Sequence, residues 1–267
     1  MMVGNSKRQS GLTFYSVTIL FFLYAPLFIL IGFSFNASNF VTVWEGFSLK
    51  WFVKVFENDD IRAAALNSVI VATFATIVAT ITAVPAAMGL ERMRGASVGP
   101  FTGLFALPLL VPEIVTAVTT LAFFSSVQMR LGLGNLIIAH TVFCIPFAMM
   151  PIRARLRGMG EELQHAGSDL YASPSRVFIR ITLPLLSPAI ISGAILSFVV
   201  SFDDFVLSVL VGDAGTTTLP VYVYGMIRRG ITPEVNAVST LLLLTSLILA
   251  GVAQYLNQNR NPGSNED

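Results

Sequence analysis

The sequence has little charge for its length, and this scarcity excludes most soluble folds. Only 12% of its 267 residues are Asp, Glu, Lys or Arg, about half the share of a soluble domain. Hydrophobic residues reach 54%, and they are grouped into long runs, as a lipid bilayer requires. The formal net charge of +1 gives no reason to expect a nucleic-acid partner. The composition indicates an all-α integral membrane protein.

Residue patterns for catalysis are also missing. The single cysteine, Cys144, excludes an intrachain disulfide and a cysteine-rich metal site. The sequence contains no G-x-x-x-x-G-K-[ST] phosphate-binding loop, so we expect this chain to bind neither ATP nor magnesium in the usual way. It has no metal-ligand spacing and no nucleophile with a matching base. We therefore expect a chain that is not an enzyme and holds no cofactor.

Six apolar runs are long enough to cross a hydrocarbon core of about 30 Å as helices. The first run has no small-x-small cleavage site after it, so we interpret it as a retained helix and not as a signal peptide. The expected helices span about residues 12–35, 66–90, 101–124, 133–150, 185–211 and 235–256. Pro108 and Pro112 interrupt the third, where they are expected to break backbone hydrogen bonds. They form one transmembrane domain, 12–257, between a short N-terminal segment, 1–11, and a polar tail, 258–267, that is expected to be disordered.

The distribution of lysine and arginine predicts the orientation, because inner loops carry an excess of both. With both termini in the cytoplasm, the inner segments contain ten basic residues: Lys7, Arg8, Arg92, Arg94, Arg153, Arg155, Arg157, Arg176, Arg180 and Arg260. The outer segments then contain six: Lys50, Lys54, Arg62, Arg130, Arg228 and Arg229. Both termini are therefore expected in the cytoplasm.

The polar loop 153–184 joins the fourth and fifth runs and contains a short amphipathic pattern. Leu163, Ala166 and Leu170 fall at i, i+3 and i+7, which gives a short helix one apolar stripe. Ser173 and Pro174 are suited to be the N-cap and first residue of a second helix. A short helix of this kind docks in the groove of a soluble partner or lies on the lipid surface. The pattern alone favours neither.

The same loop resembles the EAA loop of bacterial ABC importer permeases, which reads E-A-A-x-x-x-G, nine residues, then I-x-L-P. Aligned on residues 181–184, the motif's E-A-A falls on His165, Ala166 and Gly167, and its glycine falls on Tyr171. The chain thus departs from the motif at His165, Gly167 and Tyr171. The resemblance implies that coupling to an ATPase involves Leu163, His165, Ala166, Gly167, Asp169, Leu170 and Tyr171. A tyrosine in place of a left-handed glycine costs about 1–2 kcal/mol, which bears on the strength of coupling.

Outside the loop, the chain resembles the spermidine/putrescine branch of these permeases. The matching segments are 23–26, 34–36, 41–44, 109–115, 139–144, 197–204, 218–220 and 233–237. Their order implies the type I fold of ABC importer permeases over residues 12–257, located in a bacterial inner membrane. The resemblance further implies translocation of a polyamine such as putrescine or spermidine by alternating access. The implied partners are cytoplasmic subunits that bind ATP and magnesium, a second permease subunit and a periplasmic substrate-binding protein.

Three carboxylates lie inside the apolar runs. An ionised Glu113, Asp203 or Asp204 costs several kcal/mol there unless it is paired or hydrated. No Lys or Arg lies in the middle of any run to neutralise them, so a cationic substrate would supply the missing charge. Ser201 lies on the same helical stripe as Asp204, which we interpret as a hydrated face of the fifth helix together with Ser197 and Ser208. The predicted substrate-binding residues are therefore Asp204, Glu113, Asp203 and Ser201; the alternative is structural hydrogen bonding near an interface.

Two further patterns in the runs are interpreted as packing. His140 and Cys144 share a helical face but are an incomplete ligand set, so we expect a packed histidine with satisfied hydrogen bonds. Small residues at four-residue spacing in the second run favour close helix packing; they are Ala75, Ala79, Ala83 and Ala87.

Two other functions remain open. Intramembrane acids also suit an ion-coupled secondary carrier, but the sequence lacks two similar halves and contains the loop that resembles the EAA motif. The second alternative is an ABC permease for a different substrate.

Overall fold

The computed structural model describes residues 6–93, 98–160, 162–230 and 232–258. Within these ranges all regular secondary structure is helical, and Asn36 and Phe47 form one isolated antiparallel bridge. Among the described residues, five helices are long and apolar enough to cross a membrane, and the total is six if a bent pair of helices forms one span. This agrees with the six predicted runs. The predicted disorder of the tail concerns residues that lie almost entirely outside the described ones.

Three spans are single continuous helices: α1 (Ser6–Ser34), α3 (Asp59–Arg92) and α6 (Leu133–Arg157). The last span, α12 (Pro233–Gln258), is a fourth continuous helix. Helices α3 and α6 extend beyond the predicted runs, to Asp59 and to Arg157, because their charged ends continue the helix past the apolar stretch. Hydropathy marks where a helix meets lipid, whereas backbone hydrogen bonding decides where it ends.

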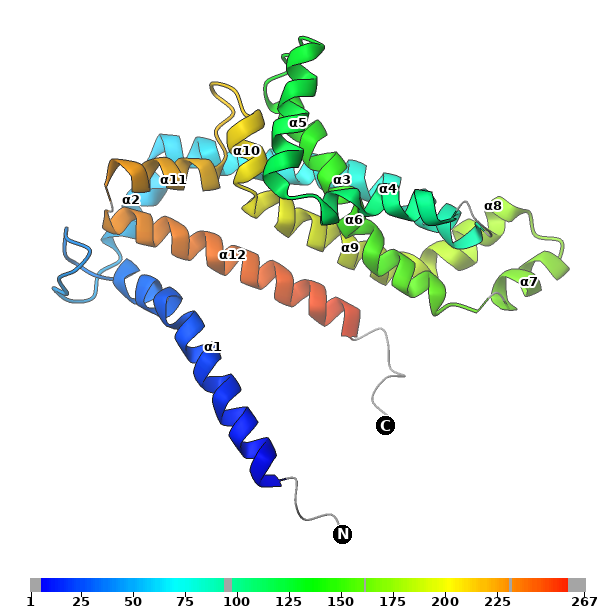
Figure 1. Cartoon of the computed structure of the whole chain (residues 1–267), viewed down its shortest axis with the longest axis horizontal. Coiled ribbons are helices and arrows are strands. Elements are labelled where there is room, and N and C mark those ends of the chain that lie inside the picture. The colour runs from blue at the N-terminus through cyan, green and yellow to red at the C-terminus, as the bar shows by residue number, and fades with distance from the viewer. Residues whose placement is uncertain (1–5, 94–97, 161, 231, 259–267) are drawn as a thin grey trace. The chain divides into compact units, whose positions relative to one another are not determined.

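The third run is broken into α4 (Val98–Leu110) and α5 (Glu113–Ser126), which are bent by 103° relative to each other (Figure 1). Pro112 is the N-cap of α5, and the residue before a proline is pushed out of the helical conformation. The run 101–124 is therefore two helices, in agreement with the interruption predicted at its prolines, and Glu113 is the first residue of the second.

The fifth run is also broken, which the sequence analysis did not predict. A chain of α8 (Pro174–Val177), the π-helix η1 (Phe178–Thr182) and α9 (Leu183–Asp203) ends at Asp203. The extended residue Asp204 follows, with ψ of 126°, and α10 (Val206–Val211) begins after Phe205. The expected helix 185–211 is thus interrupted at its acidic residues, because an aspartate competes for backbone hydrogen bonds and favours helix ends.

Contacts divide the chain into two compact units. The first contains α1, residues 223–243 and the short helix α2 (Lys50–Glu57). There Trp51 Nε1 donates to the carbonyl oxygen of Asn36 at 2.9 Å, and Lys54 pairs with Glu234 at 3.3 Å. The first contact holds α2 against the segment that follows α1, and the second holds it against the beginning of α12.

The second unit contains residues 60–222 and the part of α12 from Leu244 on. Helix α9 packs along α6 (Figure 1), and a Cβ on Gly193 would overlap the carbonyl group of Ala148. Only a glycine at this position lets the backbones of α6 and α9 come so close. The four alanines predicted to serve packing are completely buried on α3: Ala75, Ala79, Ala83 and Ala87. That prediction is confirmed.

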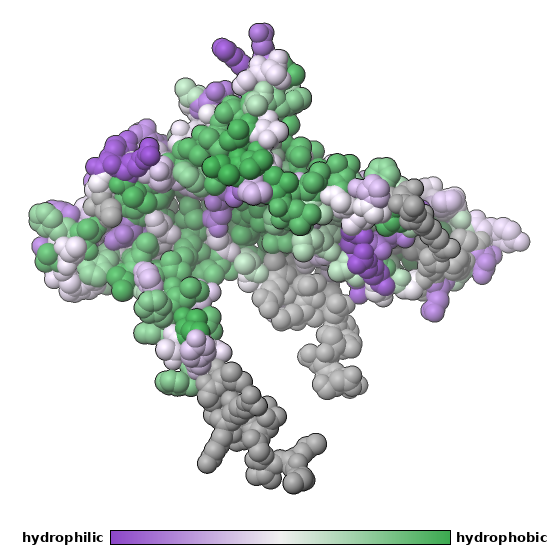
Figure 2. Space-filling model, viewed as in Figure 1, coloured by the Kyte–Doolittle hydropathy of each residue, from purple (hydrophilic) through white to green (hydrophobic). Residues whose placement is uncertain are grey.

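Apolar side chains also cover the outside of α4 and α5, which are largely green in Figure 2. Leu104, Leu110 and Ile114 are each more than half exposed. Exposed leucines and isoleucines at this density suit lipid or another membrane helix, since neither offers water.

Candidate functional site

Asp204 occupies the break between α9 and α10 and is the centre of the candidate site. It is 6% exposed. Its Oδ1 accepts a 2.9 Å hydrogen bond from the backbone N–H of Ser208, so the carboxylate caps α10. Its Oδ2 is buried and has no hydrogen-bond partner among the described residues. One oxygen is thus held by the helix end, whereas the other makes no hydrogen bond to a described residue.

His140 of α6 contacts both sides of this break. Its Nδ1 lies 2.8 Å from Ser201 Oγ of α9, and its Nε2 lies 3.2 Å from Ser208 Oγ of α10. The same Nε2 is 3.7 Å from Asp204 Oδ1. His140 is completely buried, so the prediction of a packed, satisfied histidine is confirmed. Its link to Asp204 was missed, because nothing in the sequence indicates which helix a buried histidine faces.

The serine stripe on α9 is buried against α6, so the predicted hydrated face is wrong. Ser201 is 3% exposed and its hydroxyl contacts His140. Ser197 is also buried; its Oγ donates to the carbonyl of Cys144, whose Sγ in turn lies 3.4 Å from the Ser197 carbonyl oxygen. Polar periodicity in a membrane helix marks a face that needs partners, and here the partners are protein groups and not water.

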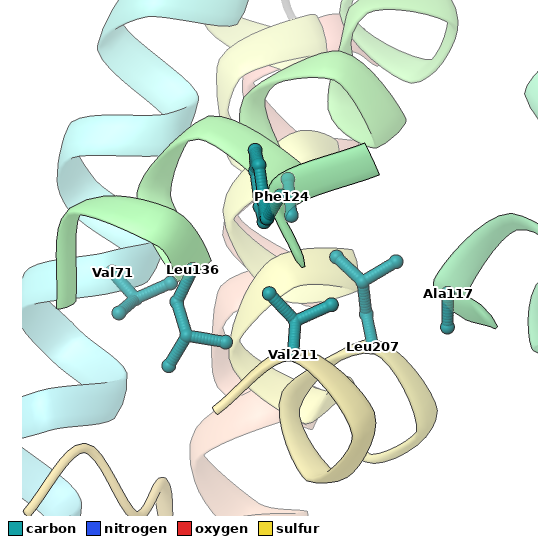
Figure 3. Packing of buried hydrophobic residues seen from close by; sticks show 7 residues of the cluster. Val71, Ala117, Phe124, Leu136, Leu207 and Val211 are labelled. Carbon is teal, nitrogen blue, oxygen red and sulfur yellow. The ribbon is translucent and has the colours of Figure 1, made fainter. Parts of the chain in front are cut away.

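Glu113 is brought close to Asp204, although 91 positions separate them in the sequence. Its carboxyl group interacts with that of Asp204, although Asp204 Oδ2 makes no hydrogen bond to a described residue. Ala117, one turn after Glu113, and Leu207, three residues after Asp204, belong to one apolar cluster (Figure 3). We call Glu113 and Asp204 the acid pair.

Electrostatics at the acid pair favour a cation. Two carboxylates side by side repel each other when both are ionised. The N-terminus of α5 begins at Glu113, and its dipole favours negative charge there. Among the described residues no Lys or Arg forms an ion pair with either carboxyl group.

Asp203 faces a different neighbour. Its Oδ2 accepts a 2.9 Å hydrogen bond from Ser246 Oγ of α12, and the residue is exposed. Of the four predicted substrate-binding residues, the structure therefore brings Glu113 and Asp204 together, binds Ser201 to His140 and turns Asp203 toward α12.

A pocket of about 940 Å³ lies at the opposite ends of α5 and α10 from the acid pair. Its walls include Gln128 and Asn135, which follow α5, and Asp213, which follows α10. The apolar cluster of Figure 3, which includes Phe124, Leu136 and Val211, occupies the space between α5, α6 and α10. The sequence analysis did not identify this pocket, because its walls combine the ends of α5 and α10, the start of α6 and the loops between them, which are far apart in the sequence.

The loop predicted to couple to an ATPase contains α7 (Glu162–Asp169). The side chains of Leu163 and His165 lie outside the described residues. Ala166, Asp169 and Leu170 are exposed, so Ala166 and Leu170 of the predicted apolar stripe are not buried by the residues that the structure describes.

Gly167 and Tyr171 explain two departures from the EAA motif. Gly167 is buried, and a Cβ there would lie 3.1 Å from side-chain carbons of Val177 and Ile181. The tight packing of α7 on α8 and η1 thus favours glycine. Tyr171 is 97% exposed and has φ of 56°, the left-handed conformation in which the motif has glycine.

Ion pairs join the C-terminal end of α6 to α3. Glu91 Oε1 accepts from Arg153 Nε at 2.8 Å and from Arg157 Nε at 3.2 Å. Arg155 donates to the carbonyl of Leu185, at the start of α9, at 3.4 Å. These contacts connect the beginning of the coupling loop to two membrane spans.

Comparison with known proteins identifies close relatives of the chain. Residues 79–261 match the family model described as binding-protein-dependent transport system inner membrane component. The chain is 37% identical over 240 residues to the spermidine/putrescine transport system permease protein PotC of Haemophilus influenzae, covering 90% of this chain and 93% of that protein. It is 36% identical over 271 residues to the same protein of Escherichia coli K12, covering 100% and 99%. The putrescine transport system permease protein PotI of Escherichia coli K12 is 36% identical over 244 residues, covering 88% and 86%.

Solved structures share the fold at low sequence identity. A chain of a bacterial ABC transporter involved in the import of the acidic polysaccharide alginate matches with a TM-score of 0.70 and 16% identity, covering 96% of this chain and 99% of that one. A chain of the MetNI methionine ABC transporter in inward-facing conformations matches with a TM-score of 0.62 and 16% identity, covering 74% and 94%.

Proposed function

This chain belongs to the family of binding-protein-dependent transport system inner membrane components and is a permease subunit of an ABC importer; we propose that its substrate is a polyamine whose ammonium group binds at Glu113 and Asp204. It is a multi-pass inner-membrane protein, and ATP hydrolysis belongs to a separate ATPase. Membership of this family argues against the alternative function of an ion-coupled secondary carrier. The polyamine is supported by relatives that carry polyamine names and match over most of the chain.

The observation that carries the proposal is the free oxygen of the acid pair. Asp204 Oδ2 is buried without a partner while a second carboxyl group lies beside it. A buried ion without a partner costs several kcal/mol, and an ammonium group would offset that cost for both carboxylates at once. A neutral or anionic substrate would leave the repulsion between Glu113 and Asp204 in place.

The proposed mechanism is alternating access. A periplasmic binding protein delivers the polyamine to a cavity between this chain and a second permease subunit. Dimerisation of the ATPase subunits moves α7, whose exposed Ala166 and Leu170 suit a groove in that partner. The contacts of Glu91 with Arg153 and Arg157 then pass the movement to α3 and α6. Both termini are proposed to lie in the cytoplasm.

Uptake by the complete importer tests the substrate. A strain from which the importer's genes have been deleted is supplied with the parental complex and given radiolabelled putrescine or spermidine. We expect uptake above the level of the deletion strain for at least one of them, and no competition from a hundredfold excess of a neutral or acidic amino acid. Competition by the amino acid, or no polyamine uptake, would instead support an ABC permease for a different substrate.

A further inference from the structure

The position of α10 depends on its contacts with α5 and α6. The helix has six residues, Val206–Val211, and is about 9 Å long. A helix this short is not stable alone, so tertiary contacts must hold it. Leu207 and Val211 anchor it in the apolar cluster (Figure 3), but apolar contacts have no direction and leave its rotation undetermined. That rotation decides where the carboxylate of Asp204 points.

His140 supplies the directional contact. Its two ring nitrogens contact a hydroxyl on each side of the break, Ser201 before it and Ser208 after it. The neutral ring has one donor and one acceptor, and both hydroxyls can serve either. Asp204 Oδ1, at 3.7 Å from Nε2, favours the hydrogen on that nitrogen, so that Nδ1 accepts from Ser201.

We propose that His140 is a positioning residue for substrate binding: through Ser208, it holds the start of α10 so that Asp204 presents its unpartnered oxygen to the substrate's ammonium group. The inference rests on the proposed function of the acid pair. Ser208 is central because its N–H binds Asp204 Oδ1 while its hydroxyl contacts His140. The N–H of Ser208 thus orients the carboxylate of Asp204, and the contact of the Ser208 hydroxyl with His140 holds the Ser208 backbone in place.

Two amide substitutions distinguish the contribution of Nε2 of His140 from that of Nδ1. His140→Gln places an amide nitrogen near the position of Nε2 and keeps the contact with Ser208. His140→Asn places it near Nδ1 and keeps only the contact with Ser201. We expect His140→Asn to lower polyamine uptake by the complete importer about ten- to a hundredfold, the range that a misplacement of about 1 Å produces. His140→Gln should retain uptake within about threefold of the parent, because the edge that faces Asp204 is preserved.

Ser208→Ala and Cys144→Ser complete the set. Ser208→Ala removes only the hydroxyl that His140 contacts and should lower uptake as His140→Asn does. Cys144→Ser changes a buried neighbour one turn along α6 that contacts Ser197 and not Asp204, so parental uptake is expected. Basal ATP hydrolysis and the amount of complex in the membrane should persist in all four variants. Equal losses in His140→Asn and His140→Gln would overturn the inference.

A double-mutant cycle separates this inference from the proposed function. If His140 acts through Asp204, adding His140→Asn to Asp204→Asn should cause no further loss of uptake. A full additional loss in the double variant would show that His140 acts elsewhere. Parental uptake by Asp204→Asn alone would refute the proposed function of the acid pair instead. If the His140→Asn chain fails to assemble into the importer, the double-mutant cycle that combines Ser208→Ala with Asp204→Asn makes the same distinction.

Discussion

The backbone N–H of Ser208 binds Oδ1 of Asp204 at 2.9 Å, whereas Oδ2 of the same carboxylate is buried without a partner. The two oxygens therefore have different roles in the structure. The first belongs to the helix cap of α10 and fixes the geometry. The second makes no hydrogen bond to a described residue, and it is the oxygen to which we propose that the substrate's ammonium group binds.

Loss of charge at the acid pair should reduce transport. Asp204→Asn keeps the shape and the cap but removes the charge that binds an ammonium group. A contact of this kind contributes about 1–3 kcal/mol, so polyamine uptake should fall about ten- to a hundredfold. Glu113→Gln should have the next largest effect. The matched control is Asp203→Asn, the same substitution on the adjacent residue that faces Ser246, which should transport best of the three. Parental uptake by both Asp204→Asn and Glu113→Gln would mean that these acids are structural.

The exposed face of α7 should be needed for coupling. Ala166→Arg places a long charged side chain in the proposed contact with the ATPase, so substrate-stimulated ATP hydrolysis should be abolished while the chain still inserts. The measurement is ATP hydrolysis by the reconstituted importer with and without substrate-loaded binding protein. Ser175→Arg, an equally exposed site on α8, is the control and should retain stimulation. Normal stimulation in Ala166→Arg would indicate that α7 lies on lipid.

Tyr171→Gly should be neutral or improve coupling. Its backbone has φ of 56°, which costs a non-glycine residue about 1–2 kcal/mol, while glycine brings an entropic cost of about 0.5–1 kcal/mol. The melting temperature of the complex should therefore be unchanged or slightly raised. Tyr171→Ala keeps the strained backbone and removes the ring, so it should show no gain. A similar loss of stimulated hydrolysis in both variants would identify the exposed ring as a contact with the ATPase.

The orientation can be tested by labelling in a Cys144→Ser background. Gly160→Cys in the coupling loop should be shielded from an impermeant thiol reagent added to intact cells. Ala214→Cys, exposed in the loop after α10, should react. Reaction of Gly160→Cys from outside would reverse the orientation and place the coupling loop on the wrong side for an ATPase.

The sequence by itself determined the features that depend on local chemistry. Long apolar runs predicted the membrane spans, because each span must satisfy its own backbone hydrogen bonds in lipid. Pro108 and Pro112 indicated a break in the third span and a helix start beside Glu113, because a proline inside a helix removes a backbone hydrogen bond. The left-handed conformation of Tyr171 followed from a motif that has glycine at that position.

Only the tertiary structure decided what faces what. The serines of α9 formed a visible stripe, but the sequence did not indicate that α6 would bury them or that His140 would join Ser201 to Ser208. The pairing of Asp204 with Glu113 likewise depends on how α5 packs against α10 (Figure 1). Such contacts join residues 61 or more positions apart. They are set by how whole helices fit together, and no local pattern of side chains specifies that fit.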